Sequence, residues 1–217
     1  MQGAIFELLM AEKNLVEEAA DARFFALCIS HRAVERQGSL AMALGLTIPQ
    51  LHDLLLRYFP NIAVACAAAS CTKVHLHRAA GGNFLCQCLG KDQPELSRSA
   101  EVQDLGSLLL DHRNGDDPAT EWLAATIASG CMGSDHLWQD LGLTHRDDLS
   151  DILRRHFSRL YAANSENMKW KKFFYKQLCD RAEVRICQAP SCSVCNDYTQ
   201  CFGPETGTGW QLLGNQR

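Results

Sequence analysis

The apolar residues of the first 36 positions recur with the spacing of an α-helix. The positions that carry this spacing are Ile5, Leu8, Leu9, Leu15, Ala19, Ala22, Phe25, Ile29 and Val34. Gly38 and Ser39 interrupt the pattern, since these residue types favour turns over helix interiors. The pattern therefore predicts helical structure at the start of the chain and a new unit from residue 39.

The unit that follows, SLAMALGLTIPQLHDLLLRYF (39–59), carries the signals of two consecutive helices. Gly45 is placed to stop the first helix, Thr47 to cap the second, and Pro49 to occupy its first turn. One apolar stripe follows, made of Leu51, Leu54, Leu55 and Tyr58. We predict a short helix, a glycine turn and a capped second helix.

The same unit recurs at DHLWQDLGLTHRDDLSDILRRHF (135–157). LGLT stands at 44–47 and again at 141–144, and the residues after it match once one inserted residue is allowed. The matching pairs are Leu51–Leu149, Leu54–Ile152, Leu55–Leu153, Arg57–Arg155 and Phe59–Phe157. Helical patterns precede both copies, so we expect repeat units of about 20–60 and 118–160.

Between the copies, residues 66–104 are less regular, although VHLH (74–77) suggests a short strand. Helix is expected again at 105–112 and from Asp117-Pro118, which is a helix-start signal.

A further helix is predicted at SENMKWKKFFYKQLCDR (165–181), and its inward-facing residues are expected to be Met168, Phe174 or Tyr175, and Leu178. From Val184 onward we expect an irregular cysteine-rich loop, with a mobile tail from Gly203. The predicted fold is mainly α: a helical domain (1–183) with a duplicated helix–turn–helix-like unit and an irregular insert, followed by the cysteine segment (184–217).

Composition and charge restrict the function classes. The chain has 217 residues, 47% apolar and 21% charged, with a net charge of −4, which is a globular balance. This charge does not favour binding to nucleic acid or to a membrane surface. The start of the chain lacks a basic leader, and no uncharged apolar run approaches the roughly 18 residues of a membrane span. We therefore expect a cytoplasmic protein.

Eleven cysteines are an odd number and, in the cytoplasm, thiols stay reduced, so a metal site is a better interpretation than a disulfide framework. Four of the cysteines lie within CQAPSCSVCNDYTQC (187–201), spaced C-x4-C-x2-C-x5-C: Cys187, Cys192, Cys195 and Cys201. The C-x4-C-x2-C part suits an iron–sulfur cluster. Structural zinc more often uses two separated knuckles. Zinc and uncommitted thiols stay open as alternatives.

Several strings in the second half resemble the nitrogen-fixation protein NifQ family. They are DHLWQDLGL (135–143), MKWKKFFYKQLC (168–179), APSC (189–192) and CFGPE (201–205), within a similar run from Trp122 to Glu205. The N-terminal third is similar only in its helical character, and the middle stretch has no assigned counterpart.

The resemblance implies a metallocluster carrier that donates molybdenum for the iron–molybdenum cofactor of nitrogenase and has no catalytic turnover. It implies a molybdenum–iron–sulfur cluster held by Cys187, Cys192, Cys195 and Cys201, molybdate as the molybdenum source, and the scaffold complex NifEN and the nitrogenase iron protein as partners. A donor should not hold molybdenum tightly, so we expect three cysteines to hold iron and the fourth to be dissociable or bridging.

Other residues are weaker candidates. A basic stripe precedes the cluster and suits docking of an acidic partner or an oxyanion, or is simply a solvated face: Lys169, Lys171, Lys172 and Lys176. Possible extra ligands, each also explicable by packing or capping, are Cys131, Cys179, His136 and His156. Cys28 is expected in the core. A second metal site is conceivable in the middle stretch, from Cys66, Cys71, His75, His77, Cys86 and Cys88.

Two functions of other classes are open. A zinc-stapled interaction protein would use the same cysteines without redox chemistry. An iron–sulfur-sensing DNA-binding regulator would use the two helix–turn–helix-like units. Against the regulator, the second copy places Asp147, Asp148 and Asp151 where they would repel phosphates.

Overall fold

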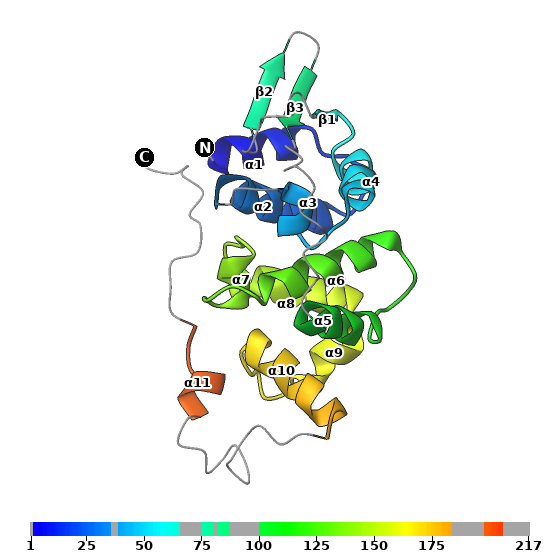
Figure 1. The fold of residues 1–217 in the computed structure, drawn as a ribbon. Coiled ribbons are helices and arrows are strands. Elements are labelled where there is room, and N and C mark those ends of the chain that lie inside the picture. The colour runs from blue at the N-terminus through cyan, green and yellow to red at the C-terminus, as the bar shows by residue number, and fades with distance from the viewer. Residues whose placement is uncertain are drawn as a thin grey trace.

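The computed structural model describes residues 2–35, 39–65, 75–79, 82–86, 100–183 and 198–205, without the side chains of residues 35, 63–65, 75–79 and 82–86. The described chain is mainly helical, as predicted. A small sheet lies beside α1 and α4 at one end of the molecule, and α10 lies at the other end (Figure 1). None of the helices in the described part is long and apolar enough to cross a bilayer.

The first half contains α1 (Gln2–Ala11), α2 (Ala19–Glu35), α3 (Leu40–Ala43) and α4 (Ile48–Tyr58). The second half repeats this order as α5 (Ala100–Leu110), α6 (Pro118–Gly130), α7 (Leu137–Asp140) and α8 (Arg146–His156). Three helices follow: α9 (Ser158–Ala163), α10 (Trp170–Arg181) and α11 (Tyr198–Phe202).

Three strands stand between the halves: β1 (Ile62–Ala65), β2 (His75–Ala79) and β3 (Gly82–Cys86). Their order is β1-β3-β2, with β1 parallel and β2 antiparallel to β3. β2 contains the strand that VHLH predicted, whereas β1 and β3 had no signal that distinguished them from irregular chain.

The duplicated unit has the same local structure in both copies. Gly45 and Gly142 both have positive φ, +70° and +74°. In each copy, the backbone N–H of the residue after the glycine donates to the carbonyl five positions before it. These are the bonds from Leu46 N to Ala41 O and from Leu143 N to Trp138 O, both 2.8 Å. This is the Schellman ending of a helix, and glycine meets its left-handed requirement without strain. The predicted glycine turns are confirmed.

The caps of the second helices differ between the copies. Thr47 caps α4, and its hydroxyl accepts from Gln50 N while the Gln50 side chain accepts from Thr47 N. In the second copy the inserted residue, His145, takes the N-cap position. The Asp148 carboxylate accepts from its N–H at 3.0 Å. Asp148 thus takes the part that the Gln50 side chain plays in the first copy.

Two asparagines show that the repeat reaches back to the first helix of each half. Asn14 N–H donates to Tyr58 O (2.7 Å), and the Asn14 side chain donates to the preceding carbonyl, Arg57 O. Asn114 makes the equivalent pair of bonds to His156 O and Arg155 O in the second half. Each asparagine satisfies carbonyl groups at the end of α4 or α8 that have no partner within the helix.

The two halves meet through equivalent helices: α2 packs on α8, and its counterpart α6 packs on α4. The two glycine turns lie so close to the opposite half that a Cβ atom at either glycine would clash with it. A Cβ on Gly45 would stand 2.6 Å from Ala125 O, and one on Gly142 would overlap the His31 side chain. The two halves therefore form one continuous core.

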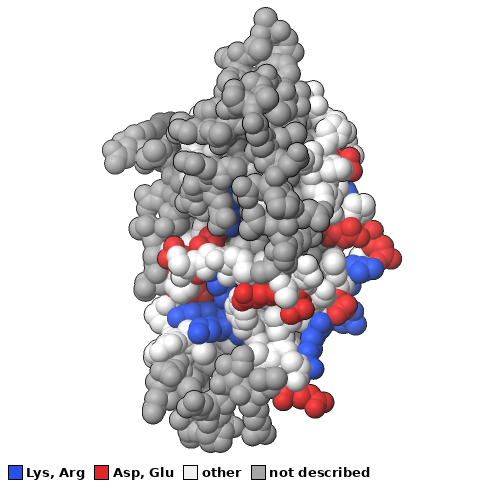
Figure 2. Space-filling model, viewed as in Figure 1, with Lys and Arg blue, Asp and Glu red and all other residues white. Residues whose placement is uncertain are grey.

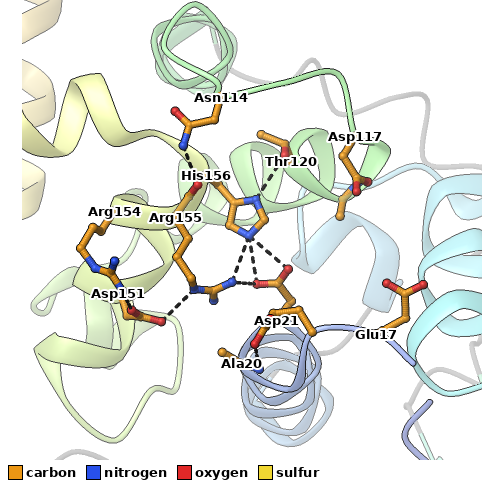
Figure 3. A network of polar contacts seen from close by, with 12 residues as sticks. Glu17, Ala20, Asp21, Asn114, Asp117, Thr120, Asp151, Arg154, Arg155 and His156 are labelled. Atoms are coloured by element: carbon orange, nitrogen blue, oxygen red, sulfur yellow. Dashed lines mark hydrogen bonds and ion pairs between the residues drawn. The ribbon is translucent and has the colours of Figure 1, made fainter. Parts of the chain in front are cut away.

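Arginine–carboxylate pairs cross the same interface. Arg57 of α4 reaches Asp117, the N-cap of α6, with Nη2 at 2.9 Å from Oδ2. Arg155 of α8 reaches Asp21 of α2 at 2.8 Å, and His156 contacts the same carboxylate (Figure 3). Burial would raise the pKa of Asp21, but the hydrogen bonds and charges of His156 and Arg155 lower it below its usual range.

The sequence misplaced several helix boundaries; α5, for example, begins at Ala100 and not at residue 105. Leu15 was expected on the buried face of a helix, but it lies in the α1–α2 loop and is 84% exposed. The reason is the nearby Asn14, whose bonds to the end of α4 fix a turn there. The helix expected from Ser165 begins only at Trp170, because Asn167 has a φ of +55°.

Candidate functional site

The site is built on the start of α10, which the aromatic residues of KWKKFF fix to the body of the protein. Trp170 is 4% exposed, and its indole N–H donates to Ser150 Oγ of α8 at 3.1 Å. Phe173 and Phe174 are buried beside it, at ring-centroid distances of 5.9 and 5.8 Å from the indole. The N-terminal end of α10 is therefore a rigid platform.

The last cysteine of the predicted motif lies on this platform. Lys169, the residue before α10, donates its backbone N–H to Cys201 O at 2.8 Å and its ammonium group to Thr199 O at 3.2 Å. Tyr198 and Phe202 stack at 4.5 Å. The sequence predicted irregular structure from residue 184 onward; instead, residues 198–202 form a helix, α11. Cys201 is half-buried and packs against the core.

Arg146, the first residue of α8, holds the chain that follows α11. Its guanidinium donates to Glu205 Oε1 at 3.0 Å and to the carbonyl of Met168 at 2.8 Å. A third bond goes to Asn167 Oδ1 at 2.9 Å. The guanidinium also lies over the Trp170 ring, 5.8 Å from its centroid. One arginine thus connects α8, the turn before α10 and the segment after Cys201.

A cleft of about 600 Å³ opens beside α11. It is bounded by the turn before α7, by the first residues of α10, and by α11 with its C-terminal extension. The lining residues that matter here are His136, Gln139, Lys169, Lys172, Gln200 and Glu205. In the view of Figure 2, basic side chains gather where α7 approaches α10. The cleft is polar and lies immediately next to the end of the cysteine motif.

The four lysines of the predicted basic stripe have different roles. Lys171 is largely buried and donates to Gly133 O at 2.9 Å and to the Asp140 carboxylate. Lys176 pairs with Asp180 one helical turn away. Lys169 binds α11, as described above. Only Lys172, among these four, is exposed at the cleft without a described partner. The stripe is therefore mostly structural, and its docking role remains a proposal.

Three comparisons relate the chain to known proteins. The NifQ family model matches residues 24–203, a range that contains all four cysteines of the C-terminal motif. Protein NifQ of Azotobacter vinelandii is 40% identical over 166 residues, covering 76% of this chain and 80% of that protein. The NifQ homolog of Sinorhizobium fredii is 33% identical over 191 residues, covering 86% and 74%.

The chain belongs to the NifQ family. Membership indicates a role in nitrogen fixation. No solved structure matches the chain. The family match reaches residue 24, so it includes α2–α4 of the first half, where the sequence alone showed only a similar helical character.

The NifQ cysteine motif is only partly within the described structure. Cys187, Cys192 and Cys195 lie outside the described residues, and Cys201 is the one member whose position is known. The ligand set therefore remains a prediction. Among the residues that the structure describes, no three histidine, cysteine or acidic side chains converge as a metal site.

The middle candidates are also open. The backbone of His75 pairs with that of Cys86 across β2 and β3, and His77 pairs with Phe84. The side chains of this sheet, and all of Cys66, Cys71 and Cys88, lie outside the described structure. Whether they hold a metal is untested.

The remaining candidates can be placed individually. Cys131 is 4% exposed, and burial raises the pKa of its thiol to about 12 although Lys171 acts in the opposite direction. Cys28 is buried as predicted, and burial raises its pKa as well. Cys179 is half-buried in α10. His156 contacts Asp21 and Thr120 inside the interface, a packing role, whereas His136 lines the cleft as the N-cap residue of α7.

Three residues of the site escaped sequence reasoning: Arg146, Asp140 and Glu205. Asp140 binds Lys171 and also accepts from Asp135 N–H at 3.1 Å, and so fixes the turn that forms one wall of the cleft. Two of the three lie in strings that resemble the NifQ family, Asp140 in DHLWQDLGL and Glu205 in CFGPE. Their roles depend on partners more than 30 positions away.

Proposed function

We propose that this NifQ-family protein carries a molybdenum–iron–sulfur cluster on Cys187, Cys192, Cys195 and Cys201 and donates molybdenum for assembly of the iron–molybdenum cofactor. The observation that carries the proposal is the position of Cys201. Its helix lies on a rigid platform beside a polar cleft, and the other three cysteines precede it within the range of the family match. Thiolates suit both iron and reduced molybdenum.

The length of the connecting chain is compatible with wrapping around a cluster. α10 has 12 residues and is therefore about 18 Å long. The chain from Arg181 to Tyr198 must return beside the start of α10, where Lys169 meets Cys201. The sixteen residues between them could span up to about 50 Å if extended. The excess length leaves room for three cysteines to converge on a cargo near Cys201.

As a donor, the protein would bind its cargo and release it to a receiving complex without catalytic turnover. NifEN and the nitrogenase iron protein are the proposed partners, molybdate is the proposed source of molybdenum, and the cytoplasm is the proposed location. Exposed Lys172 at the cleft offers a positive charge for an acidic docking surface.

The DNA-binding alternative is disfavoured by the packing of the two helix–turn–helix-like units. α4 and α8 are the would-be recognition helices, yet each packs against the other half. The arginines at the matching positions of the two helices, Arg57 and Arg155, are bound to Asp117 and Asp21 within the protein and are not available to phosphate groups. The zinc alternative is distinguished by the metal and sulfide content of the purified protein.

The test is metal and acid-labile sulfide content per chain, on protein purified without oxygen from cells supplied with molybdate. We expect iron and sulfide in comparable amounts, together with molybdenum. The single variants Cys187→Ala, Cys192→Ala, Cys195→Ala and Cys201→Ala should each lower bound iron, whereas Cys28→Ala in the core should not. Zinc without sulfide, or equal iron in all five variants, would refute the cluster assignment.

A further inference from the structure

Cys201 is held in place by contacts that involve no metal, and Arg146 joins the two chain segments that meet there. The two chain segments that meet at Cys201 are residues 167–169 and 199–205. Arg146 bonds to both, at Asn167 and Met168 on one side and at Glu205 on the other. The hydrogen bond from Lys169 N to Cys201 O joins the same two segments, one residue after Met168 and four residues before Glu205.

The burial of the pair makes this connection strong. The side chain of Glu205 is 7% exposed and that of Arg146 is 20% exposed. A carboxylate so far removed from water is stable only with a cation beside it. Loss of the guanidinium would therefore favour release of Glu205 to solvent, and the chain from Glu205 back to Cys201 would follow.

We propose that Arg146 and Glu205 are positioning residues that hold Cys201 in its cluster-binding place before any metal is present. This inference rests on the proposed function. Cys201 would then be the fixed ligand of the set, and the dissociable cysteine would be one of the other three. A ligand already in place lowers the ordering cost of binding, and contacts outside the ligand set are what orient ligands elsewhere.

The first test needs no metal. The metal-free full-length protein is treated with iodoacetamide under native conditions, and the alkylation rate of each cysteine is followed by peptide mass spectrometry. In Arg146→Gln and Glu205→Gln we expect Cys201 to react several-fold faster than in the unaltered chain. Arg154→Gln is the matched control, because Arg154 lies on the same helix and forms an exposed pair with Asp151. Buried Cys131 should stay protected in every variant that keeps its fold.

The second test uses the loaded protein. We expect Arg146→Gln to retain less iron and sulfide after exposure to a chelator and to change the electron paramagnetic resonance spectrum of the bound cluster. Arg146→Lys should restore part of both properties, because it keeps the charge but loses the two-pronged geometry. Arg154→Gln should match the unaltered protein.

The outcomes separate the two proposals. Cys201 alkylation at the unaltered rate in both Arg146→Gln and Glu205→Gln would overturn the positioning role, whatever metal the protein binds. Faster alkylation of Cys201 in a protein that never contains iron or sulfide would support the positioning of Cys201 but refute the cluster. If Cys131 also reacts in Arg146→Gln, that variant has lost its fold. The alkylation rate of Cys201 in Glu205→Gln, which keeps the guanidinium, then tests the positioning role alone.

Discussion

Asp21 and His156, 135 positions apart in the chain, lie 3.0 Å apart at the interface between the two halves. Arg155 approaches the same carboxylate at 2.8 Å, and the Asp21 side chain is only 6% exposed (Figure 3). The carboxylate is therefore neutralised entirely by groups of the opposite half.

The first prediction concerns this carboxylate. Asp21→Asn removes the charge that faces Arg155 and His156, while Arg155 keeps its bond to Asp151 at 2.9 Å, so we expect a loss of about 1–3 kcal/mol in the free energy of unfolding at pH 7. Because the pKa of Asp21 is lowered in the folded protein, its contribution is present above the unfolded pKa and is lost as the pH falls below about 4. The gap between the two proteins in urea unfolding should therefore narrow in acid.

The control for this prediction is Asp116→Asn, since Asp116 is 88% exposed in its pair with Arg113. We expect that change to stay within about 0.5 kcal/mol at all pH values. A constant gap for Asp21→Asn from pH 7 to pH 3 would contradict the role assigned to its ionisation.

The second prediction concerns the glycine turns. Gly142→Ala forces a left-handed conformation on a residue with a Cβ, at about 1–2 kcal/mol, and drives that Cβ into His31. Thermal unfolding should show a loss of about 2 kcal/mol or more, and Gly45→Ala should behave alike. Gly106→Ala, inside α5 with open space around the new Cβ, should instead gain about 0.5–1 kcal/mol.

The third prediction separates two neighbouring lysines. Lys171→Met leaves the buried Asp140 carboxylate unpaired, so we expect a loss of about 3 kcal/mol in denaturant unfolding. Lys172→Met, at an exposed position, should change stability by less than about 0.5 kcal/mol. Equal effects would show that Lys171 is not the structural member of the pair. If the cleft docks an acidic partner, Lys172→Glu should slow association without loss of stability.

The fourth prediction tests the carbonyl cap. Asn114→Ala removes the side-chain bond to Arg155 O and the two bonds that the Asn114 amide oxygen accepts from Ser158. A loss of about 1–2 kcal/mol is expected, measured by urea unfolding. Asn61→Ala, which removes one exposed bond to Glu12, should cost less than about 0.5 kcal/mol. Equal stability of Asn114→Ala and Asn61→Ala would contradict the stabilising role assigned to the Asn114 cap.

Local signals predicted much of the fold. Gly45, Thr47 and the Asp117-Pro118 start all act within a few residues of their own position, and all are found where the sequence placed them. Leu15 was misplaced because the turn around it is fixed by the end of α4, more than 40 positions away. Helical periodicity cannot register such a partner.

The site shows the same limit. The cysteine spacing and the lysine stripe could be recognised from the sequence alone. The role of each lysine could not, because a partner such as Asp140 lies 31 positions before Lys171. The pair of Arg146 and Glu205 spans 59 positions and joins two residues of ordinary type. Contacts of this kind depend on how α10 lies against α7 and how the chain after α11 lies against α8, which no local pattern contains.

α2 packs on α8 and α6 packs on α4, so each half meets the other through the same pair of equivalent helices. This is the pattern of an isologous interface, in which each surface meets its own counterpart. Residues 2–156 therefore have the architecture of a homodimer whose protomers have been joined into a single polypeptide. The second half leads into α10, α11 and the cysteine segment, and the first half leads into the strands instead. Where a true dimer would present two such segments, the described body leads into one at its C-terminal end, so under the proposed function each molecule would carry one cluster on this motif.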